Sequence, residues 1–506
     1  MNTTKRVVIE PLTRVEGHGK VTIKLDPAGA VESARLHVVE FRGFERFIQG
    51  RPYWEIPVAV QRLCGICPVS HHLAAAKAMD GIVGVDQVTP TAEKIRRLMH
   101  YGQIFQSHSL HFFHLSSPDL LFGFDSDPAR RNVLGVAGAY PELARQGILM
   151  RKFGQEVIRA TAGKKVHGTG AIPGGVNRSL TTAERQELAS EIPQQKEWAR
   201  TAVGIARDYT LDNLGFAAEF AAFPSNHLGL VRRDGTFDLY DGVLRAVNSA
   251  GKKILDDVEV DRYADVLIEE VKPWSYMKFP FLRELGPETG WYRVGPLARL
   301  AVCDRIGTPE AEAALVEFVE AMGGVPGTMS LAYHWARMIE TLSALEEIER
   351  LLDDPDIEGD ELVLQGERRN EAVGVIEAPR GTLFHHYVVA DDDTVMRANL
   401  IVSTTSNNEP MNRAVESVAR KYLSGTEITE GLLNHVEVAI RAYDPCLSCA
   451  THALGKMPLV MEVHDAEGRI VGEGCHFIDL LRFLAGAPIS GWSVFPTPAS
   501  PRCSPP

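Results

Sequence analysis

The chain has 506 residues, 45% of them hydrophobic and 24% charged, which is typical of a globular protein that buries a large core. Its net charge of −13 argues against nucleic acid or an anionic membrane as the main partner, because both attract basic surfaces. The sequence has no apolar run of about 18 residues that would span a membrane, and residues 1–8 lack the apolar stretch of a signal peptide.

In chain order, the first predicted element is a β-hairpin. Val21, Ile23 and Leu25 alternate with polar residues, residues 26–29 have turn composition, and the chain returns over residues 31–41. This hairpin is the predicted N-terminal β element.

Helical patterns dominate the middle of the chain. Two threonine–proline pairs, at 89–90 and 308–309, and the capping box at 181–184 mark helix starts. Five helices are predicted. Two are defined by their starts, at residues 68 and 181, and three by both ends: 90 to about 114, 308 to the glycine pair 323–324, and 331–352. We therefore predict an α+β fold, a central bundle of long helices with small peripheral β elements at the N-terminal and C-terminal ends. No repeat or linker divides residues 1–452, which form one predicted domain.

Two Cys-x-x-Cys pairs lie near opposite ends of the chain. The first is Cys64 and Cys67, the second is Cys446 and Cys449, and a histidine closely follows each. Zinc ribbons keep their pairs about 15–20 residues apart, whereas here only the completed fold can bring the pairs together. Four soft sulfur donors exclude magnesium and calcium, and favour zinc, an Fe–S cluster or a thiolate-held transition metal. Cysteines used as ligands rather than disulfides fit a reducing cytoplasm, so we expect a cytoplasmic protein.

The flanks of both pairs resemble the nickel-binding signatures of [NiFe]-hydrogenase large subunits, R-x-C-G-x-C-x-x-x-H over residues 62–71 and D-P-C-x-x-C-x-x-H over residues 444–452. Further segments resemble elements of that family and occur in its order, namely residues 14–18, 41–45, 173–175, 377–381 and 403–407. The surrounding sequence is similar to the soluble, bidirectional, NAD-linked branch. The resemblance implies the large-subunit fold and the catalytic subunit of a hydrogenase, which cleaves dihydrogen reversibly and heterolytically to protons and electrons.

The resemblance also implies a set of metal ligands. Cys64 and Cys446 would be terminal thiolates on nickel, whereas Cys67 and Cys449 would bridge nickel to an iron that carries CO and cyanide. Cys446 would then serve as the first proton acceptor, and Glu16 would be the next.

By the same resemblance, further residues surround the metals. Arg380 and Thr404 would donate hydrogen bonds to the cyanides, which otherwise would be buried charges without partners. Pro379 belongs to the same loop as Arg380. His71 and Asp444 would steady the metal-binding sulfurs from outside.

Two more residues, Glu45 and His452, resemble the protein ligands of the structural Mg²⁺ found in many members. The family commonly has an aspartate where this chain has Ser107, so no carboxylate is expected at that place. We interpret four histidines of the long helix as packed, hydrogen-bonded side chains rather than a second metal site, namely His100, His108, His111 and His114.

The chain offers no exit for electrons. No remaining cysteine cluster would hold an Fe–S centre, and no G-x-G-x-x-G follows a strand as a nucleotide site would require. The resemblance therefore implies two kinds of partner, a small subunit with an Fe–S cluster and a flavin- and NAD-binding diaphorase module. The alternatives are an NADP- or deazaflavin-linked hydrogenase, a dihydrogen sensor that does not turn over, and a relative of the quinone-site subunit of respiratory complex I, which has lost the thiolates.

Residues 453–506 carry a separate prediction. The family's nickel-dependent endopeptidase cuts after the histidine of the second motif, here between His452 and Ala453, in a maturation that also uses chaperones. We therefore expect a pro-segment that keeps Cys446 and Cys449 accessible until nickel is loaded. The alternative is an ordinary C-terminal subdomain, because a hairpin-like pattern begins at Leu459.

Overall fold

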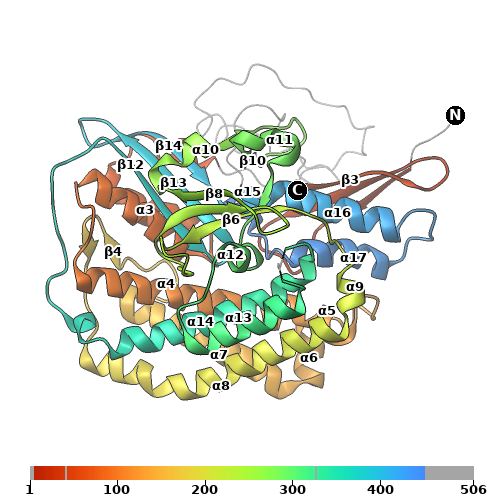
Figure 1. Ribbon diagram of the computed structural model, residues 1–506, viewed down its shortest axis with the longest axis horizontal. Helices are drawn as coiled ribbons and strands as arrows, with labels where there is room; N and C mark the ends of the chain where they lie inside the picture. Colours follow the sequence, from red (N-terminus) through yellow and green to blue (C-terminus); the bar gives the residue numbers. More distant parts are fainter. Residues whose placement is uncertain (1–4, 40–42, 325–326, 451–506) are drawn as a thin grey trace, which may run out of the picture. The chain divides into compact units, whose positions relative to one another are not determined.

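A bundle of long helices forms the centre of the fold in the computed structural model, which describes residues 5–39, 43–324 and 327–450. The long helices are α3 (Pro68–Ile82), α4 (Pro90–Leu110), α7 (Pro141–Ala162), α8 (Thr182–Asp212), α13 (Pro309–Ala321), α14 (Tyr333–Asp353), α16 (Asn408–Tyr422) and α17 (Glu430–Arg441). In Figure 1, α4, α7, α8, α13 and α14 lie side by side, and α4 packs against both α7 and α14.

Shorter helices connect the long ones. They are α1 (Phe44–Phe47), α2 (Ile56–Ala59), α5 (Ser117–Phe122), α6 (Val133–Ala139), α9 (Leu214–Ala217), α10 (Tyr263–Val266), α11 (Gly286–Thr289), α12 (Pro296–Val302) and α15 (Ser403–Ser406). No helix of the described residues is both long enough and apolar enough to cross a lipid bilayer.

The predicted helix starts are confirmed. The Thr89 hydroxyl oxygen caps α4 by accepting a hydrogen bond from the Ala92 amide at 3.1 Å. Thr181 and Glu184 form the reciprocal capping box of α8. The predicted end near residue 114 falls within a π-helical segment, His111–Ser116, that continues α4 toward α5.

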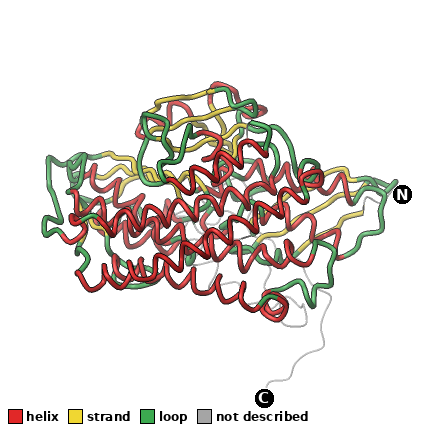
Figure 2. Tube along the Cα trace, turned by 60° about the horizontal axis from the view of Figure 1, so that its bottom comes forward, coloured by secondary structure: helices red, strands yellow, loops and turns green. Residues whose placement is uncertain are grey.

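The strands form small separate sheets around the bundle (Figure 2). They are β1 (Lys5–Ile9), β2 (Gly19–Leu25), β3 (Val31–Val38), β4 (Ala171–Ile172), β5 (Gly175–Val176), β6 (Asn226–Val231), β7 (Val243–Val247), β8 (Lys253–Val258), β9 (Leu267–Glu270), β10 (Phe279–Leu282), β11 (Tyr292–Arg293), β12 (Glu371–Ala378), β13 (Gly381–Val389) and β14 (Val395–Ile401). The predicted hairpin is β2 with β3, and β1 extends it into an antiparallel sheet. A four-stranded sheet of order β11-β6-β7-β8, in the middle of the chain, was not predicted.

The sheet β12-β13-β14 places one wall of the interior site. Helix α3 packs against β12 and β13, and the tight turn between these two strands carries Pro379 and Arg380. Gly381 follows with φ +135°, and a Cβ there would lie 2.3 Å from a Val294 methyl carbon. Glycine therefore allows the turn to approach its neighbour closely.

Candidate metal centre

The four predicted cysteines meet at one point in the interior. All four are buried, and their sulfur atoms lie within 4.8 Å of one another. Cys64 Sγ is 3.1 Å from Cys446 Sγ, and Cys67 Sγ is 3.9 Å from Cys449 Sγ. Across residues 5–39, 43–324 and 327–450, no other group of histidine, cysteine or acidic side chains is arranged to hold a metal ion. The predicted convergence of the two pairs is confirmed.

The first pair is placed by the start of α3. Cys67 is the N-cap residue, and Pro68 occupies the first helical turn. The amides of Ile66 and Cys67 donate hydrogen bonds to Cys64 Sγ at 3.2 and 3.1 Å. Unsatisfied N–H groups at a helix start favour thiolate over thiol, so this position suits a metal ligand.

The second pair is placed by a turn and by a neighbouring helix. Cys446 precedes a 3₁₀ turn, Leu447–Cys449, and its amide donates to Thr404 Oγ1 at 2.9 Å. Thr404 belongs to α15, which follows β14 directly. The second pair is therefore tied to the same sheet that carries Arg380.

The electrostatics of the cluster call for a cation. Burial raises the pKa of the Cys446 and Cys449 thiols well above the usual range. Burial also opposes ionisation of Cys64, but hydrogen bonds from the other three thiols lower the pKa of Cys64 well below its usual value. One nearby guanidinium, Arg380, does not balance four thiolates in a low-dielectric interior. Soft sulfur donors suit a transition metal, so the donor set fits nickel and iron.

A carboxylate contacts the cluster from the β1–β2 connection. Cys446 Sγ donates a hydrogen bond to Glu16 Oε2 at 2.8 Å, and the Leu447 amide donates to the Glu16 carbonyl at 3.0 Å. The next residue, Gly17, has φ +80°, and a Cβ there would lie 2.6 Å from the Ser448 nitrogen. Glycine at this position therefore permits the two loops to meet.

Ser448 is a site residue that the sequence analysis missed. Its hydroxyl donates to Glu16 Oε1, and its amide donates to Glu16 Oε2 at 3.3 Å. Ser448 lies between the two cysteines of the second pair, and that position was the signal that could have identified it. Burial raises the pKa of Glu16 in spite of these hydrogen bonds.

Arg380 lies beside the cluster and is almost completely buried. Its Nη2 donates to Asp444 Oδ1 at 3.1 Å, and its Nη1 donates to Ser107 Oγ at 3.3 Å. Asp444 counters the cost of burial and raises the pKa of the guanidinium. Burial raises the pKa of Asp444 in turn. Arg380, Pro379 and Thr404 line a small cavity together with Cys67 and Cys446.

A buried ion network holds the loop that carries Arg380. Arg299, on α12, donates to the carbonyl oxygens of Ala378 and Pro379 at 2.9 and 3.3 Å. It also donates to Glu340 at 2.6 Å and to Glu377 at 2.8 Å, and all three charged side chains are fully buried. Arg299 was not predicted, because nothing in its local sequence distinguishes it.

His71, on α3, is buried and lines the same small cavity as Cys67. Its Nδ1 is 3.1 Å from His385 Nε2, and His385 Nδ1 is 2.6 Å from the Tyr387 hydroxyl. These contacts fix the orientation of the His71 ring. His385 and Tyr387, both on β13, were not predicted.

Glu45 lies in a separate polar cluster. Its Oε1 accepts hydrogen bonds from the Leu400 amide at 2.9 Å and from Lys278 at 3.3 Å, and Lys278 also pairs with Glu269 at 3.3 Å. Oxygen donors are the ligands that Mg²⁺ takes, so Glu45 and Glu269 are chemically suited to it. The predicted second ligand, His452, and the predicted cleavage site at His452 and Ala453 lie outside the described residues.

Three of the four predicted histidines have ordinary partners, whereas the buried Nδ1 of His114 has no hydrogen-bond partner in the described part of the chain. His100 Nε2 contacts the carbonyls of Leu239 and Glu377, His108 Nε2 contacts Glu340, and His111 Nε2 contacts the Arg441 carbonyl. These contacts agree with packed, hydrogen-bonded histidines rather than a second metal site.

Fold and site together define a protein in which four buried cysteines are placed to hold a transition metal beside a hydrogen-bonded carboxylate. Residues 42–122 and 235–452 match the nickel-dependent hydrogenase family, and residues 6–41 match the HoxL-like family. The chain belongs to the nickel-dependent hydrogenase family, and the predicted resemblance is confirmed.

Relatives cover almost the whole chain. The NAD-reducing hydrogenase HoxS subunit beta of Cupriavidus necator is 49% identical over 93% of this chain and 99% of its own length. One chain of the F420-non-reducing hydrogenase of Methanothermobacter thermautotrophicus is 41% identical over 92% of this chain and 99% of its own length.

Solved structures confirm the fold class. An NAD⁺-reducing [NiFe]-hydrogenase in the H2-reduced state has a TM-score of 0.88 and is 58% identical, over 89% of this chain and 100% of that chain. The Ni-Fe-Se hydrogenase of D. vulgaris Hildenborough has a TM-score of 0.72 at 24% identity over the same shares, a likeness of fold alone. The α+β large-subunit fold is therefore established.

Proposed function

We propose that this chain is the catalytic subunit of an NAD-linked [NiFe]-hydrogenase, which splits dihydrogen reversibly into protons and electrons. The observation that carries the proposal is the 2.8 Å contact between Cys446 Sγ and Glu16 Oε2 at a buried cluster of four thiols. It puts a base within one hydrogen bond of a metal ligand. Heterolytic cleavage of dihydrogen, an apolar and weakly acidic molecule, needs both a metal that binds it and a base that accepts the proton.

Cys64, Cys67, Cys446 and Cys449 would hold a centre of nickel and an iron that carries CO and cyanide. When bound, this centre supplies the electron-poor metal that takes up and polarises dihydrogen. Because the four cysteines are buried, they would hold the metals away from bulk water.

The proton would leave through groups of the chain itself. Cys446 Sγ holds it first, and the hydrogen bond to Glu16 Oε2 gives it a direct path outward. Burial raises the pKa of Glu16, which makes the carboxylate a better proton acceptor near neutral pH. The Ser448 hydroxyl, donating to the other carboxylate oxygen, fixes the direction of Glu16.

Arg380 and Thr404 would face the cyanides. The Thr404 oxygen already accepts a hydrogen bond from the Cys446 amide, which leaves the hydroxyl hydrogen free to donate. The buried Arg380 Nε has no hydrogen-bond partner among the described residues. A buried donor of this kind needs an acceptor, which supports an anionic ligand beside it.

His71, Asp444 and Pro379 would shape the surroundings of the metals. Asp444 holds the Arg380 guanidinium, and His71 is oriented by His385. Glu45, with His452, would bind a structural Mg²⁺.

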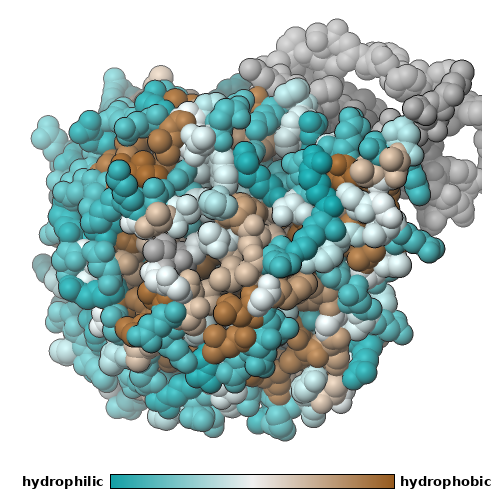
Figure 3. Space-filling view, turned by 45° about the vertical axis from the view of Figure 1, so that its right-hand side comes forward, coloured by the Kyte–Doolittle hydropathy of each residue, from teal (hydrophilic) through white to brown (hydrophobic). Residues whose placement is uncertain are grey.

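The electrons would leave through partner subunits, a small subunit with an Fe–S cluster and a flavin- and NAD-binding diaphorase. Exposed apolar side chains support this. Large apolar side chains are exposed, among them Leu134 at 83%, Ile148 at 57% and Trp54 at 51%. Figure 3 shows apolar side chains gathered over the middle of one face, the kind of surface that a partner covers. The metal-ligand role of the thiols supports a reducing cytoplasm as the setting.

The nucleotide is proposed from the relative that is named NAD-reducing. Turnover of the purified complex with NAD, NADP or a deazaflavin tests this linkage. NAD should give the fastest dihydrogen-dependent reduction. Preference for another acceptor would assign the chain to that branch, and failure to turn over with any acceptor would favour a sensor.

We also propose that residues 453–506 are removed in maturation, by an endopeptidase that acts after chaperone-assisted nickel loading. Support comes from the family match, which stops at residue 452, and from the NAD⁺-reducing [NiFe]-hydrogenase chain that is matched completely by 89% of this one. Intact-mass measurement on active enzyme should give a chain that ends at His452. Active enzyme with the full-length chain would reject the proposal.

Metal analysis of the matured complex tests the centre itself. Nickel and iron should both be present, and replacing any one of the four cysteines by serine should abolish dihydrogen oxidation, because a hard alkoxide does not substitute for a soft thiolate. Cys303→Ser is the matched control, since Cys303 is only partly buried and lies outside the cluster. Zinc alone in the wild type would reject the proposed centre.

A further inference from the structure

A second cavity, about 760 Å³ in volume, opens between α4, α14 and the connections at residues 232–237 and 306–308. It shares no lining residue with the small cavity beside the cysteines. Its volume lies within the range, about 300–1,000 Å³, of sites that hold small organic molecules.

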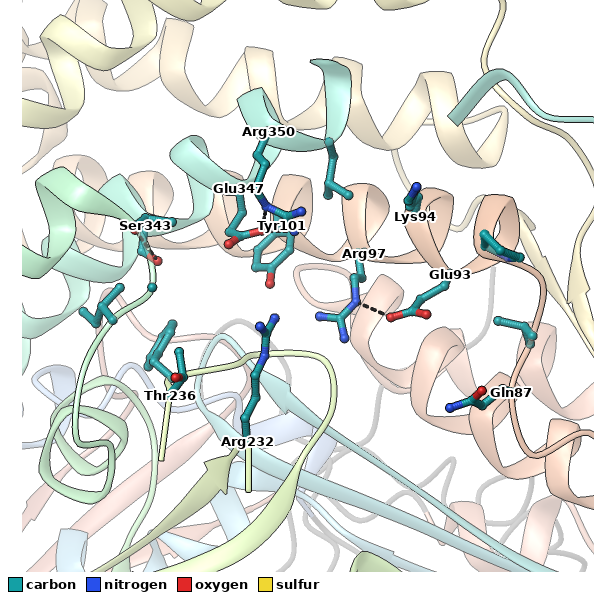
Figure 4. Close-up of a pocket in the computed structure, with 17 residues that line it drawn as sticks. Gln87, Glu93, Lys94, Arg97, Tyr101, Arg232, Thr236, Ser343, Glu347 and Arg350 are labelled. Atoms are coloured by element: carbon teal, nitrogen blue, oxygen red, sulfur yellow. Dashed lines mark hydrogen bonds and ion pairs between the residues drawn. The ribbon is translucent and has the colours of Figure 1, made fainter. Parts of the chain in front are cut away.

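Tyr101, on α4, is the residue that marks this cavity as a binding site. The residue is only 3% exposed, yet its hydroxyl points into the cavity (Figure 4). This hydroxyl has no hydrogen-bond partner within the part of the chain that the structure describes, although buried tyrosines usually have one. Burial raises the pKa of the phenol, so the hydroxyl stays protonated and acts as a donor. A phenylalanine would pack the same space without placing this donor in the cavity.

Two arginines approach the same point. Arg97 Nη1 and Arg232 Nε donate to Asp238 at 3.0 and 2.8 Å, and Asp238 is only 2% exposed. One buried carboxylate thus holds two guanidinium groups. Arg97 Nε donates a hydrogen bond to Glu93, which lies at the rim of the cavity. The Glu93 side chain is 46% exposed, so water screens its charge. Each arginine therefore keeps one Nη group for a ligand, and Figure 4 shows both side chains directed toward the Tyr101 hydroxyl.

The cavity is lined by charged as well as apolar side chains, which suit an anion with an apolar organic part. Its charged residues are four cations and two carboxylates, on a chain whose net charge is −13: Lys94, Arg97, Arg232 and Arg350 against Glu93 and Glu347. Lys94 is held by Asp354 and Asp356, and Arg350 is held by Glu347. Arg97 and Arg232 are balanced in charge by Asp238 and Glu93, so they offer a ligand their remaining Nη donors rather than a net positive charge. Apolar side chains, including Phe237 and Ile306, line the cavity beside them.

We propose that this cavity binds a small organic anion, whose phosphate or carboxylate group accepts hydrogen bonds from Tyr101, Arg97 and Arg232 while its apolar body lies against Phe237 and Ile306. Guanidinium groups suit such oxyanions because their N–H groups form a planar fork. The ion pairs alone would explain the arginines, but they do not explain an open cavity with a buried phenol that donates into it.

The test uses the matured complex and four probes: phenyl phosphate, benzoate, inorganic phosphate and phenol. Calorimetry should show binding of phenyl phosphate or benzoate that is tighter than that of inorganic phosphate or phenol, and crystal soaks should place the anion at Tyr101. The tighter of the two organic anions identifies the group that the site prefers.

Two variants locate the binding. Tyr101→Phe removes one donor and keeps the packed ring, and Arg232→Gln removes one charge while Arg97 keeps its partner Asp238. Each should weaken binding of the organic anion about tenfold, the effect of losing one hydrogen bond to a charged group. Arg233→Gln is the matched control, because the neighbouring arginine pairs outward with Asp257 and Glu259. The proposal is overturned if neither organic anion binds, if both variants bind like the wild type, or if phenol binds as tightly as the anions.

Discussion

Replacing Glu16 by glutamine tests the proposed proton path at its first step beyond the cluster. The amide keeps the shape of the side chain and still accepts a hydrogen bond from Ser448, but it does not take up a proton near neutral pH. The backbone contact between the Leu447 amide and the carbonyl of residue 16 is unchanged. We therefore expect Glu16→Gln to fold, to load its metals and to fail in proton transfer.

The structure indicates a large effect. The proton has a direct 2.8 Å step from Cys446 Sγ to Glu16 Oε2. Asp444, the other buried acid of the site, is engaged by Arg380 at 3.1 Å and is poorly placed to take over. A positioned acid or base contributes about 10²–10⁴ in rate. Without a substitute, we expect a loss of about a thousandfold, which corresponds to about 4 kcal/mol in the barrier.

The assay is H/D exchange under dihydrogen, measured beside steady-state turnover and metal content. Exchange and turnover should fall together while nickel and iron stay at wild-type levels. Glu10→Gln is the control, the same substitution at an exposed position of the same connection. Ser448→Ala keeps the carboxylate and should cost about tenfold, because one hydrogen bond is lost. Exchange by Glu16→Gln at the wild-type rate would refute the relay.

Three further predictions concern Arg380, Arg299 and His227. Arg380→Lys keeps the charge but loses the guanidinium fork, so turnover should fall at least about tenfold with normal metal content; unchanged turnover would count against contact with a metal ligand. Arg299→Met leaves Glu340 and Glu377 buried without their cation, and chemical denaturation should show a loss of about 3–5 kcal/mol; a loss below about 1 kcal/mol would contradict the network's role. Burial lowers the pKa of His227 to about 3. Unfolded histidine titrates near 6.5, so the unfolded state binds the extra proton and stability falls as pH drops from about 6.5 toward 3. His227→Gln should make this fall shallower by about 1 kcal/mol per pH unit, and an identical pH dependence would disprove it.

Local signals were sufficient for the helices and the hairpin. Capping threonines fix where α4 and α8 begin, because a side-chain oxygen satisfies an amide three residues later in the sequence. Alternation over β2 is equally local, since one face of that strand packs into the core. The site ligands were predicted for a different reason. Cys64 and Cys446 stand in spacings that metal chemistry requires, whatever fold brings them together.

The middle sheet could not be predicted in the same way. Strands β6 and β7 are buried on both faces, so their residues show no polar alternation. The ion network around Arg299 has a related cause. Its partners Glu340 and Glu377 lie far along the chain, on α14 and β12. Their pairing depends on how helices and sheet pack, and no local pattern encodes that.

The contact between Glu16 and Cys446 depends on backbone as much as on side chains. The two residues form a parallel β-bridge, and the Leu447 amide donates to the Glu16 carbonyl. The distance from sulfur to carboxylate is therefore set by paired main chains near opposite ends of the sequence. A relay built only from flexible side chains would lose this alignment whenever either rotamer changed. Because Gly17 allows the close approach, a side chain at position 17 would separate the carboxylate from the cysteine without altering either residue.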